Sequence, residues 1–299
     1  MPRTRRLVST RRLVSLVLFL AALIAPALSA LAEPAIWVVK GPHATVYLFG
    51  TIHALQKGDS WHSAKIDAAI QQSQTLWLEI PNVDDAASMQ PLVLQLGMDQ
   101  AHPLSTKLTP DQLAKLTKAA NSVGLPGGEA MFETFKPWLA ALTLSLAPLM
   151  QAGYDPSTGV ETELKPEFTN ANKPVKGFET AEQQMHYFAD MSDEVQIDFL
   201  NSELDDFDSA VDKFKQMLAA WSAGDTDALD KFNNAEFRDK YPDLFQILVV
   251  KRNQNFAAQI NDMLKGDGVT FVAIGAGHLV GKDGVPAMLE KQGYKVTRE

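Results

Sequence analysis

The sequence contains two similar stretches in which a strand-like run of β-branched and aromatic residues ends at a glycine, with a histidine three positions later. The first, Thr45–Leu55, reads TVYLFGTIHAL and carries His53; the second, Thr270–Leu279, reads TFVAIGAGHL and carries His278. Each pattern predicts a buried strand that delivers a histidine from the turn beyond its C-terminal end. Since side chains from several strand ends converge at that edge of an open α/β sheet, we expect the two histidines to lie together.

A third strand-like segment, Leu76–Ile80, contains a single carboxylate, Glu79, near its end. Burial of an unpaired carboxylate is costly, so Glu79 either turns to solvent or meets a partner at the sheet edge. Likewise, each histidine either has a functional role or is a hydrogen-bonded residue at a loop edge. Two histidines and a carboxylate would form a metal site with positions left open for water. Because the chain has no cysteine, the ion would be zinc, manganese, cobalt or iron.

The order of the segments predicts an α/β fold. Trp61–Gln74 has apolar residues on one helical face and lies between the first two strands, which makes a strand–helix–strand unit long enough for a parallel crossover. Capping boxes begin helices after Thr109 and Thr180. We therefore expect a central, mostly parallel sheet built from strand–helix–strand units. A large helical insertion, at about 180–265 and with few strand signals from 192 onward, would cover the site as a lid.

Three further polar residues are candidates for the same site. Glu161 and Glu179 would supply another ligand or a general base, although roles at helix ends explain them equally well. Arg252 lies in a predicted helix, where its guanidinium either faces a partner in a cleft or lies on the surface. The sequence has no G-x-S-x-G, H-E-x-x-H or Walker motif, which argues against the corresponding hydrolases and nucleotide-binding proteins.

Residues 1–32 have the pattern of a secretory signal peptide: an arginine-rich start, an apolar run from Leu13 to about Leu28, and a small-residue end at Ala30–Ala32. An uncleaved anchor helix is the alternative. We expect residues 33–299 to form a single α/β domain, periplasmic or secreted, with no stable membrane span after cleavage. The net charge of −9 and an aromatic content of 8% argue against a nucleic-acid partner.

These motifs together resemble the bacterial TraB/GumN family, which is related to the animal Tiki proteases. The resemblance extends from about Ile36 to Thr297, nearly the whole chain after residue 32. The matching segments are Tyr47–His53, Leu78–Glu79, Lys136–Trp138, Gly159–Glu161, Gly177–Thr180 with Gln184, Arg252–Asn253 and Gly275–Val285.

The resemblance implies an α/β core like that of the erythromycin-esterase and ChaN group. It also implies an active centre formed by the two G-x-x-H motifs and a glutamate. The likeness to the Tiki proteins implies a manganese- or cobalt-dependent peptidase. By that likeness His53, His278 and Glu79 are metal or catalytic positions, and Glu179 and Arg252 are further catalytic positions. The family often has aspartate where this chain has Glu161, which argues against a direct ligand role for that residue.

The sequence therefore predicts an exported, metal-dependent hydrolase, a peptidase that acts on a peptide or protein with a metal-activated water. Its ion would be manganese, cobalt or zinc, held by His53, His278 and Glu79. Glu79, Glu179 and Arg252 would be the catalytic residues, and no residue is assigned to an organic cofactor. The alternative is a non-catalytic periplasmic binding protein that sequesters a peptide or a metal-bearing ligand in the same pocket.

Overall fold

The computed structural model describes residues 33–82, 86–124 and 127–299, and Glu33–Glu299 form one compact unit. The predicted signal peptide lies outside the described residues. In chain order the strands and helices are β1 (Ile36–Lys40), β2 (His43–Thr51), α2 (Ala64–Gln72), β3 (Thr75–Leu78), α3 (Ala86–Gly97), α4 (Pro110–Ser122), α5 (Pro137–Gln151), α6 (Val160–Asn170), β4 (Val175–Gly177), α7 (Ala181–Ala189), α8 (Asp193–Asp206), α9 (Ala210–Ser222), α10 (Thr226–Asp230), α11 (Glu236–Lys240), α12 (Pro242–Phe245), α13 (Lys251–Lys265), β5 (Asp267–Gly275), α14 (Val285–Lys291) and β6 (Val296–Arg298).

The six strands form one sheet in the order β4-β3-β5-β2-β1-β6. The neighbours β4, β3, β5 and β2 are parallel, whereas β1 runs antiparallel to both β2 and β6. The predicted α/β fold with a mostly parallel sheet is therefore confirmed. The segment expected only to lead into the first strand is itself a strand, β1, joined to β2 by a tight turn in which the Gly41 N–H donates to the Ala44 carbonyl.

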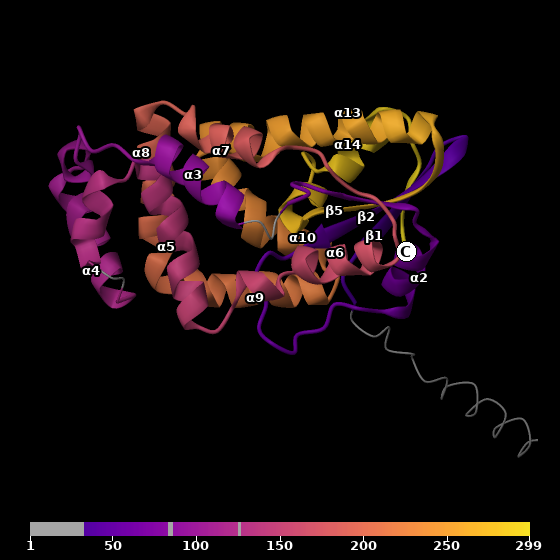
Figure 1. The fold of residues 1–299 in the computed structure, drawn as a ribbon, viewed down its shortest axis with the longest axis horizontal. Helices are drawn as coiled ribbons and strands as arrows, with labels where there is room; N and C mark the ends of the chain where they lie inside the picture. The colour runs from indigo at the N-terminus through magenta and orange to yellow at the C-terminus, as the bar shows by residue number, and fades with distance from the viewer. Residues whose placement is uncertain (1–32, 83–85, 125–126) are drawn as a thin grey trace, which may run out of the picture. The chain divides into compact units, whose positions relative to one another are not determined.

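Helices cover both faces of this sheet (Figure 1). Helices α13 and α14 lie on one face, and α2 and α6 on the other. The central strand β5 is buried from Phe271 to Gly275, as expected for a parallel strand covered on both sides. The rings of Phe49, Trp61 and Phe271 pack together in this core, with ring centroids 5.5 and 5.9 Å from Phe49. The core holds the ends of the strands in fixed positions.

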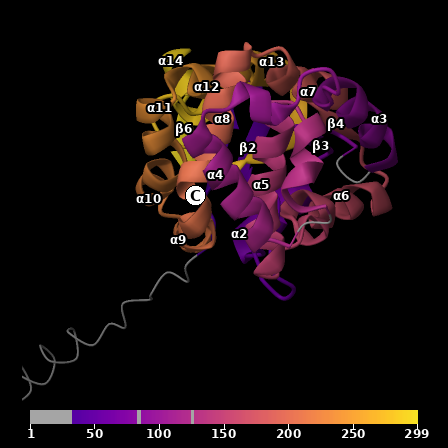
Figure 2. The ribbon, with the colours of Figure 1, turned by 90° about the vertical axis from the view of Figure 1, so that its left-hand side faces the viewer.

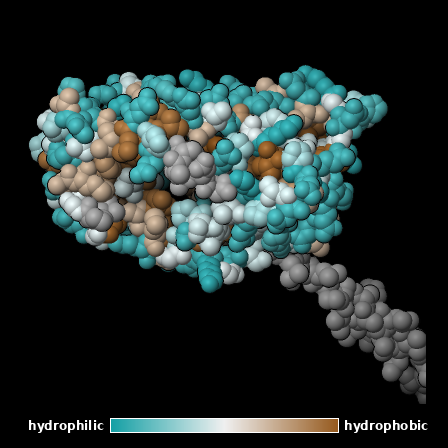
Figure 3. All heavy atoms as spheres, viewed as in Figure 1, coloured by the Kyte–Doolittle hydropathy of each residue, from teal (hydrophilic) through white to brown (hydrophobic). Residues whose placement is uncertain are grey.

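A second hydrophobic cluster lies within the helical part of the chain. It includes Trp138 and Leu144 of α5 and Phe199 and Leu200 of α8. Figures 1 and 2 show α4, α5 and α8 beyond one end of the sheet. On the face drawn in Figure 3, hydrophobic residues gather mainly over this helical part. The expected helical insertion is present: the segment from α7 to α13 contains helices and no strand. No helix in the described part of the chain is long and apolar enough to cross a membrane.

Candidate functional site

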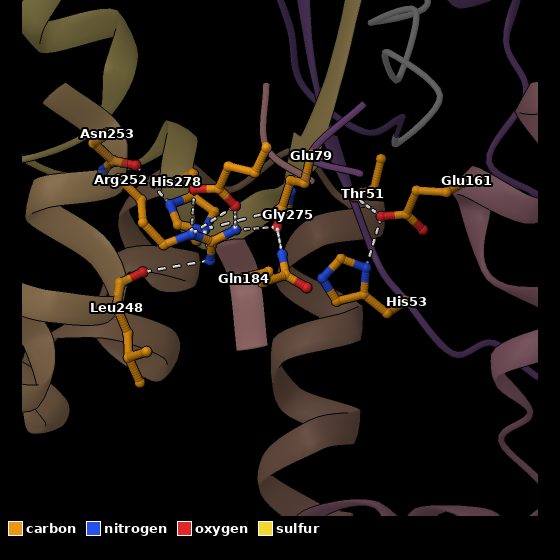
Figure 4. Close-up of polar contacts among 12 residues, drawn as sticks. Thr51, His53, Glu79, Glu161, Gln184, Leu248, Arg252, Asn253, Gly275 and His278 are labelled. Carbon is orange, nitrogen blue, oxygen red and sulfur yellow. Dashed lines mark hydrogen bonds and ion pairs between the residues drawn. The ribbon is translucent and has the colours of Figure 1, made fainter. Parts of the chain in front are cut away.

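Four adjacent parallel strands deliver polar side chains to one edge of the sheet. His53 follows β2, His278 follows β5, Glu79 follows β3 and Glu179 follows β4. The first three surround Gly275, the last residue of β5 (Figure 4). A methyl group at Gly275 would lie 3.0 Å from Oε1 of Glu79, 3.3 Å from Nε2 of His53 and 3.5 Å from Cδ2 of His278. The structure thus brings together His53, His278 and Glu79, which we expected to meet because each follows the end of a strand.

Both carboxylate oxygens of Glu79 are hydrogen-bonded. The Gly275 N–H donates to Oε1 over 2.7 Å, while Oε2 accepts from Gln184 Nε2 at 3.2 Å and from Arg252 Nη2 at 2.5 Å. Glu79 is only 7% exposed, so its possible orientation toward solvent is excluded. Burial opposes its ionisation, but the charge of Arg252, the nearby imidazoles and the Gly275 N–H hold the pKa of Glu79 well below its usual range. Glu79 is therefore an ionised, fixed carboxylate.

Arg252, at the start of α13, joins Glu79 to Glu179. Its Nε and Nη2 donate to Glu179 over 3.0 and 2.8 Å, and Nη2 also donates to Glu79. The guanidinium lies against the rings of Tyr187 and Phe256, 5.6 and 5.4 Å from their centroids. Arg252 is 8% exposed, so the surface interpretation is wrong. A buried arginine that is paired with two carboxylates fixes both of them and neutralises part of their charge.

His278 is held as a neutral imidazole. The Asn253 Nδ2 donates to the Asp283 carbonyl over 2.7 Å, which turns Oδ1 of Asn253 toward Nδ1 of His278 at 2.6 Å. This network assigns the proton to Nδ1, so Nε2 presents a lone pair, 3.2 Å from Arg252 Nη1. Burial lowers the pKa of His278 to about 4, and the positive charge of Arg252 acts in the same direction. His278 is thus a neutral acceptor at physiological pH.

His53 has the opposite character. Its Nδ1 lies 2.7 Å from Oε1 of Glu161, and its side chain is 66% exposed. The Glu161 carboxylate raises the pKa of His53 to about 9 and also accepts the Thr51 hydroxyl. Glu161 reaches this position because Gly159 packs directly on the His53 backbone, where a side chain would meet the carbonyl oxygen at 2.3 Å. Glu161 therefore lies behind His53 and contacts its Nδ1.

Both imidazoles have the surroundings of metal-ligating histidines, with Nδ1 held by an acceptor and Nε2 left for another contact. Imidazole and carboxylate donors suit a divalent zinc, manganese or cobalt ion. As the side chains stand in the described ranges 33–82, 86–124 and 127–299, however, no group of three or more His, Asp or Glu residues is placed to hold an ion. Nε2 of His278 is 3.8 Å from Glu79 Oε1, and Arg252 contacts both residues. The imidazole and carboxylate groups are of the types that bind a divalent ion. In their observed positions, however, Glu79 and His278 contact the guanidinium of Arg252.

A cavity of about 560 Å³ connects this centre with the helical part of the chain. His53 and Arg252 line it, together with residues of α5, α7, α8, α9 and α11. Its aromatic wall consists of Phe188, Phe199, Phe232, Phe237 and Tyr241. A separate hollow of about 690 Å³ lies between α7 and α13 and is lined by none of His53, Glu79 and His278. The smaller cavity is therefore the one that gives a ligand access to the centre.

Sequence reasoning missed three residues that contact the centre: Thr51, Tyr187 and Phe256. Tyr187 follows Gln184 by three positions on α7, so the predicted helix would have placed the two on one face. Phe256 likewise lies one helical turn beyond Arg252 on α13, and its ring meets His278 edge-on with centroids 5.3 Å apart. Helical spacing could therefore have located Tyr187 and Phe256 from the sequence, but not Thr51.

The fold and the site define an α/β protein whose parallel strands end in a centre of histidine, glutamate and arginine that is buried except at His53, beside a largely helical part. The chain belongs to the TraB/PrgY/gumN family, whose sequence profile matches residues 35–298. It is 22% identical over 257 residues to the uncharacterized protein YbaP of Escherichia coli, across 86% of this chain and 92% of that protein. YbaP of Shigella flexneri matches with the same identity and coverage. No solved structure matches significantly. The family resemblance read from the motifs is confirmed.

Proposed function

We propose that this protein is an exported hydrolase that cleaves peptides with a water activated by a divalent manganese, cobalt or zinc ion. One observation carries the proposal: two imidazole rings with fixed Nδ1 atoms and a buried carboxylate meet around Gly275, beside a cavity that a ligand can enter. The resemblance to the Tiki proteases supports a peptide as substrate. The signal-peptide pattern of residues 1–32 supports export to the periplasm or beyond.

Each residue of the centre has a role in this proposal. His53 and His278 would hold the ion through Nε2, with Glu79 Oε1 as third ligand, and the ion would supply a water of lowered pKa. Glu79 suits a ligand better than a general base, because its strongly lowered pKa makes it a weak acceptor of protons. Arg252 would place positive charge beside the substrate carbonyl and stabilise the oxyanion that develops there. Glu179 would keep Arg252 in position.

A second candidate is the non-catalytic binding protein, which would sequester a peptide or a metal-bearing ligand in the same cavity. The position of Arg252 favours it. Because this guanidinium contacts Glu79, Glu179 and Nε2 of His278, the centre is largely neutralised without an ion. A cavity beside such a centre provides a binding surface without requiring a reaction.

The deciding experiment combines metal analysis with a peptide-cleavage screen. The purified protein is equilibrated with manganese, cobalt and zinc in turn, and its retained metal is measured by elemental analysis. We expect wild type to retain one ion and the His53→Ala/His278→Ala variant to lose both the ion and cleavage, by at least about 100-fold. The matched control is His43→Ala/His102→Ala, which removes two exposed histidines.

The outcomes separate the two candidates. Cleavage that persists in the site variant, with its circular dichroism spectrum unchanged, would exclude the proposed centre. Cleavage by wild type without retained metal would exclude metal dependence. Capture of peptides in fixed stoichiometry, with no product in the presence of any of the three metals, would establish the binding protein instead.

A further inference from the structure

Glu203 differs from the other ionisable residues that line the cavity beside the site. Within the part of the chain that the structure describes, it has no hydrogen-bond or ion-pair partner, whereas every other carboxylate of the lining is paired with a lysine. These pairs are Asp205 with Lys115 at 3.1 Å, Asp206 with Lys213 at 2.7 Å, and Glu236 with Lys213 and Lys240 at 3.0 and 2.5 Å. Glu203 is therefore the one unpaired carboxyl group among the described residues of the lining.

The position of Glu203 follows from the geometry of α8. Phe199, Ser202, Glu203 and Asp206 are spaced as i, i+3, i+4 and i+7, so one face of this helix lines the cavity. Burial, with the nearby charge of Asp206, raises the pKa of Glu203 to about 7. Glu203 is thus a half-buried carboxyl group on the cavity wall for which the described part of the protein provides no cation.

The surroundings of Glu203 indicate what kind of group would compensate it. All four cationic groups of the described lining are already bound to carboxylates: His53, Lys213, Lys240 and Arg252. The aromatic wall beside them offers apolar surface, on which an aliphatic chain packs, and ring faces that attract cations. A positively charged group on an apolar stem therefore matches this part of the cavity, and an anionic group does not.

We propose that Glu203 is a specificity residue that accepts a positively charged group of a peptide ligand. The group is the ammonium or guanidinium of a lysine or arginine side chain, or the ammonium at the peptide N-terminus. The inference rests on the proposed function for the peptide nature of the ligand, but not on cleavage of the peptide.

Four synthetic pentapeptides of otherwise identical sequence test this. Their central residue is lysine or the uncharged norleucine, and their N-terminus is free or acetylated. Affinities are measured by isothermal titration calorimetry with a chelator present, and mass spectrometry verifies that each peptide stays intact. We expect wild type to bind a charged peptide about ten-fold or more tightly than the acetylated norleucine peptide. The comparison of lysine with the free N-terminus identifies which ammonium is recognised.

The matched variants are Glu203→Gln and Asp205→Asn. Each removes one carboxylate from the same helix, but Asp205 already has Lys115 as its partner. We expect the preference to disappear in Glu203→Gln and to persist in Asp205→Asn. Equal affinities of wild type for all four peptides, no binding of any, or an unchanged preference in Glu203→Gln would overturn the inference.

The same data distinguish this inference from the proposed hydrolysis. A preference for charged peptides that depends on Glu203, with no product formed when the chelator is replaced by metal, retains the inference and excludes the hydrolase. Cleavage of the peptides without any preference for charge excludes the inference and retains the hydrolase.

Discussion

The two histidines of the site share a sequence pattern but differ in charge. His53 is largely exposed and faces the carboxylate of Glu161, so it carries a proton at neutral pH. His278 is buried and faces the amide of Asn253, so it does not. An ion bound by both Nε2 atoms would therefore displace a proton from His53 but none from His278. The same G-x-x-H motif thus provides one cationic and one neutral imidazole.

Gly275 is the residue on which the spacing of the site depends. Its φ of −48° is accessible to any L-residue, so backbone strain does not require glycine here. Gly275→Ala would instead push a methyl group against Glu79 Oε1 and His53 Nε2. These contacts require the neighbouring side chains to move by a few tenths of an ångström. Because a displacement of about 1 Å in a reacting centre costs roughly 100-fold in rate, we expect this smaller shift to lower cleavage by about 10-fold. Steady-state cleavage and thermal unfolding would be measured together.

The control for this substitution is Gly266→Ala, just before the start of β5, where a methyl group would meet a single backbone oxygen at 3.4 Å. We expect it to leave cleavage within a few-fold of wild type. Wild-type cleavage by Gly275→Ala would show that the three residues around Gly275 do not act together.

At the scale of elements, the sequence predicted the strands and helices that have a recognisable local sequence pattern. Runs of β-branched and aromatic residues that end at a glycine located β2 and β5, and the parallel arrangement of these strands brings His53 and His278 to one edge. The capping boxes at Thr109 and Thr180 begin α4 and α7 as predicted. Strand β1 was missed as a separate element, although the dipeptide Gly41–Pro42 marks the turn between β1 and β2.

The orientation of Arg252 was left open by the sequence for a physical reason. A π-helical segment, Gln246–Val250, directly precedes α13 and adds residues to the local turn. Such a segment changes which residues face inward, and a periodicity of 3.6 residues does not reveal it. The partner of Arg252, Glu179, lies 73 residues away in the sequence, so local patterns do not identify the pair. The strand-end residues were predictable, and the network between them was not.

The two capping boxes provide a test of how an element supports the site. Replacing either Thr109 or Thr180 by Ala removes an N-cap hydrogen bond and should cost about 1 kcal/mol of unfolding free energy. Helix α7 follows Glu179 and carries Gln184 and Tyr187, so we expect only Thr180→Ala also to lower peptide cleavage, by several-fold. Urea denaturation and cleavage rates measure the two effects. Equal rates in the two variants would show that the position of α7 does not influence the centre.

At the scale of the whole described unit, the site lies where two hydrophobic clusters meet. His53 and Arg252 belong to elements packed on the sheet, while Phe199 and Phe188 of the opposite wall belong to or pack against the helical cluster. A cavity of about 560 Å³ is tolerated at such a boundary because neither core has to be interrupted to form it. The cavity instead lowers stability through its polar lining, above all through Glu203, whose carboxyl group has no partner among the described residues.

The unpaired carboxyl group of Glu203 predicts a pH dependence of the free energy of unfolding. Because the pKa of Glu203 rises from 4.5 to about 7 on folding, the folded state holds this proton more tightly than the unfolded state. Below about pH 4 both states are protonated and Glu203 has no effect. Between about pH 4 and pH 8 the folded state loses stability as pH rises. Above about pH 8 the ionised Glu203 lowers the free energy of unfolding by its full amount, about 1–3 kcal/mol.

Glu203→Gln removes the penalty, so we expect the variant to be more stable than wild type above about pH 8 by roughly 1–3 kcal/mol, and to match it near pH 4. Urea denaturation at a series of pH values measures the difference. Glu290→Gln makes the same chemical change at an exposed position of α14 and should shift stability by less than about 0.5 kcal/mol at every pH. A Glu203→Gln variant whose advantage is absent at high pH would mean that Glu203 is compensated in the folded protein. The cavity would then carry no unpaired charge for a ligand to meet.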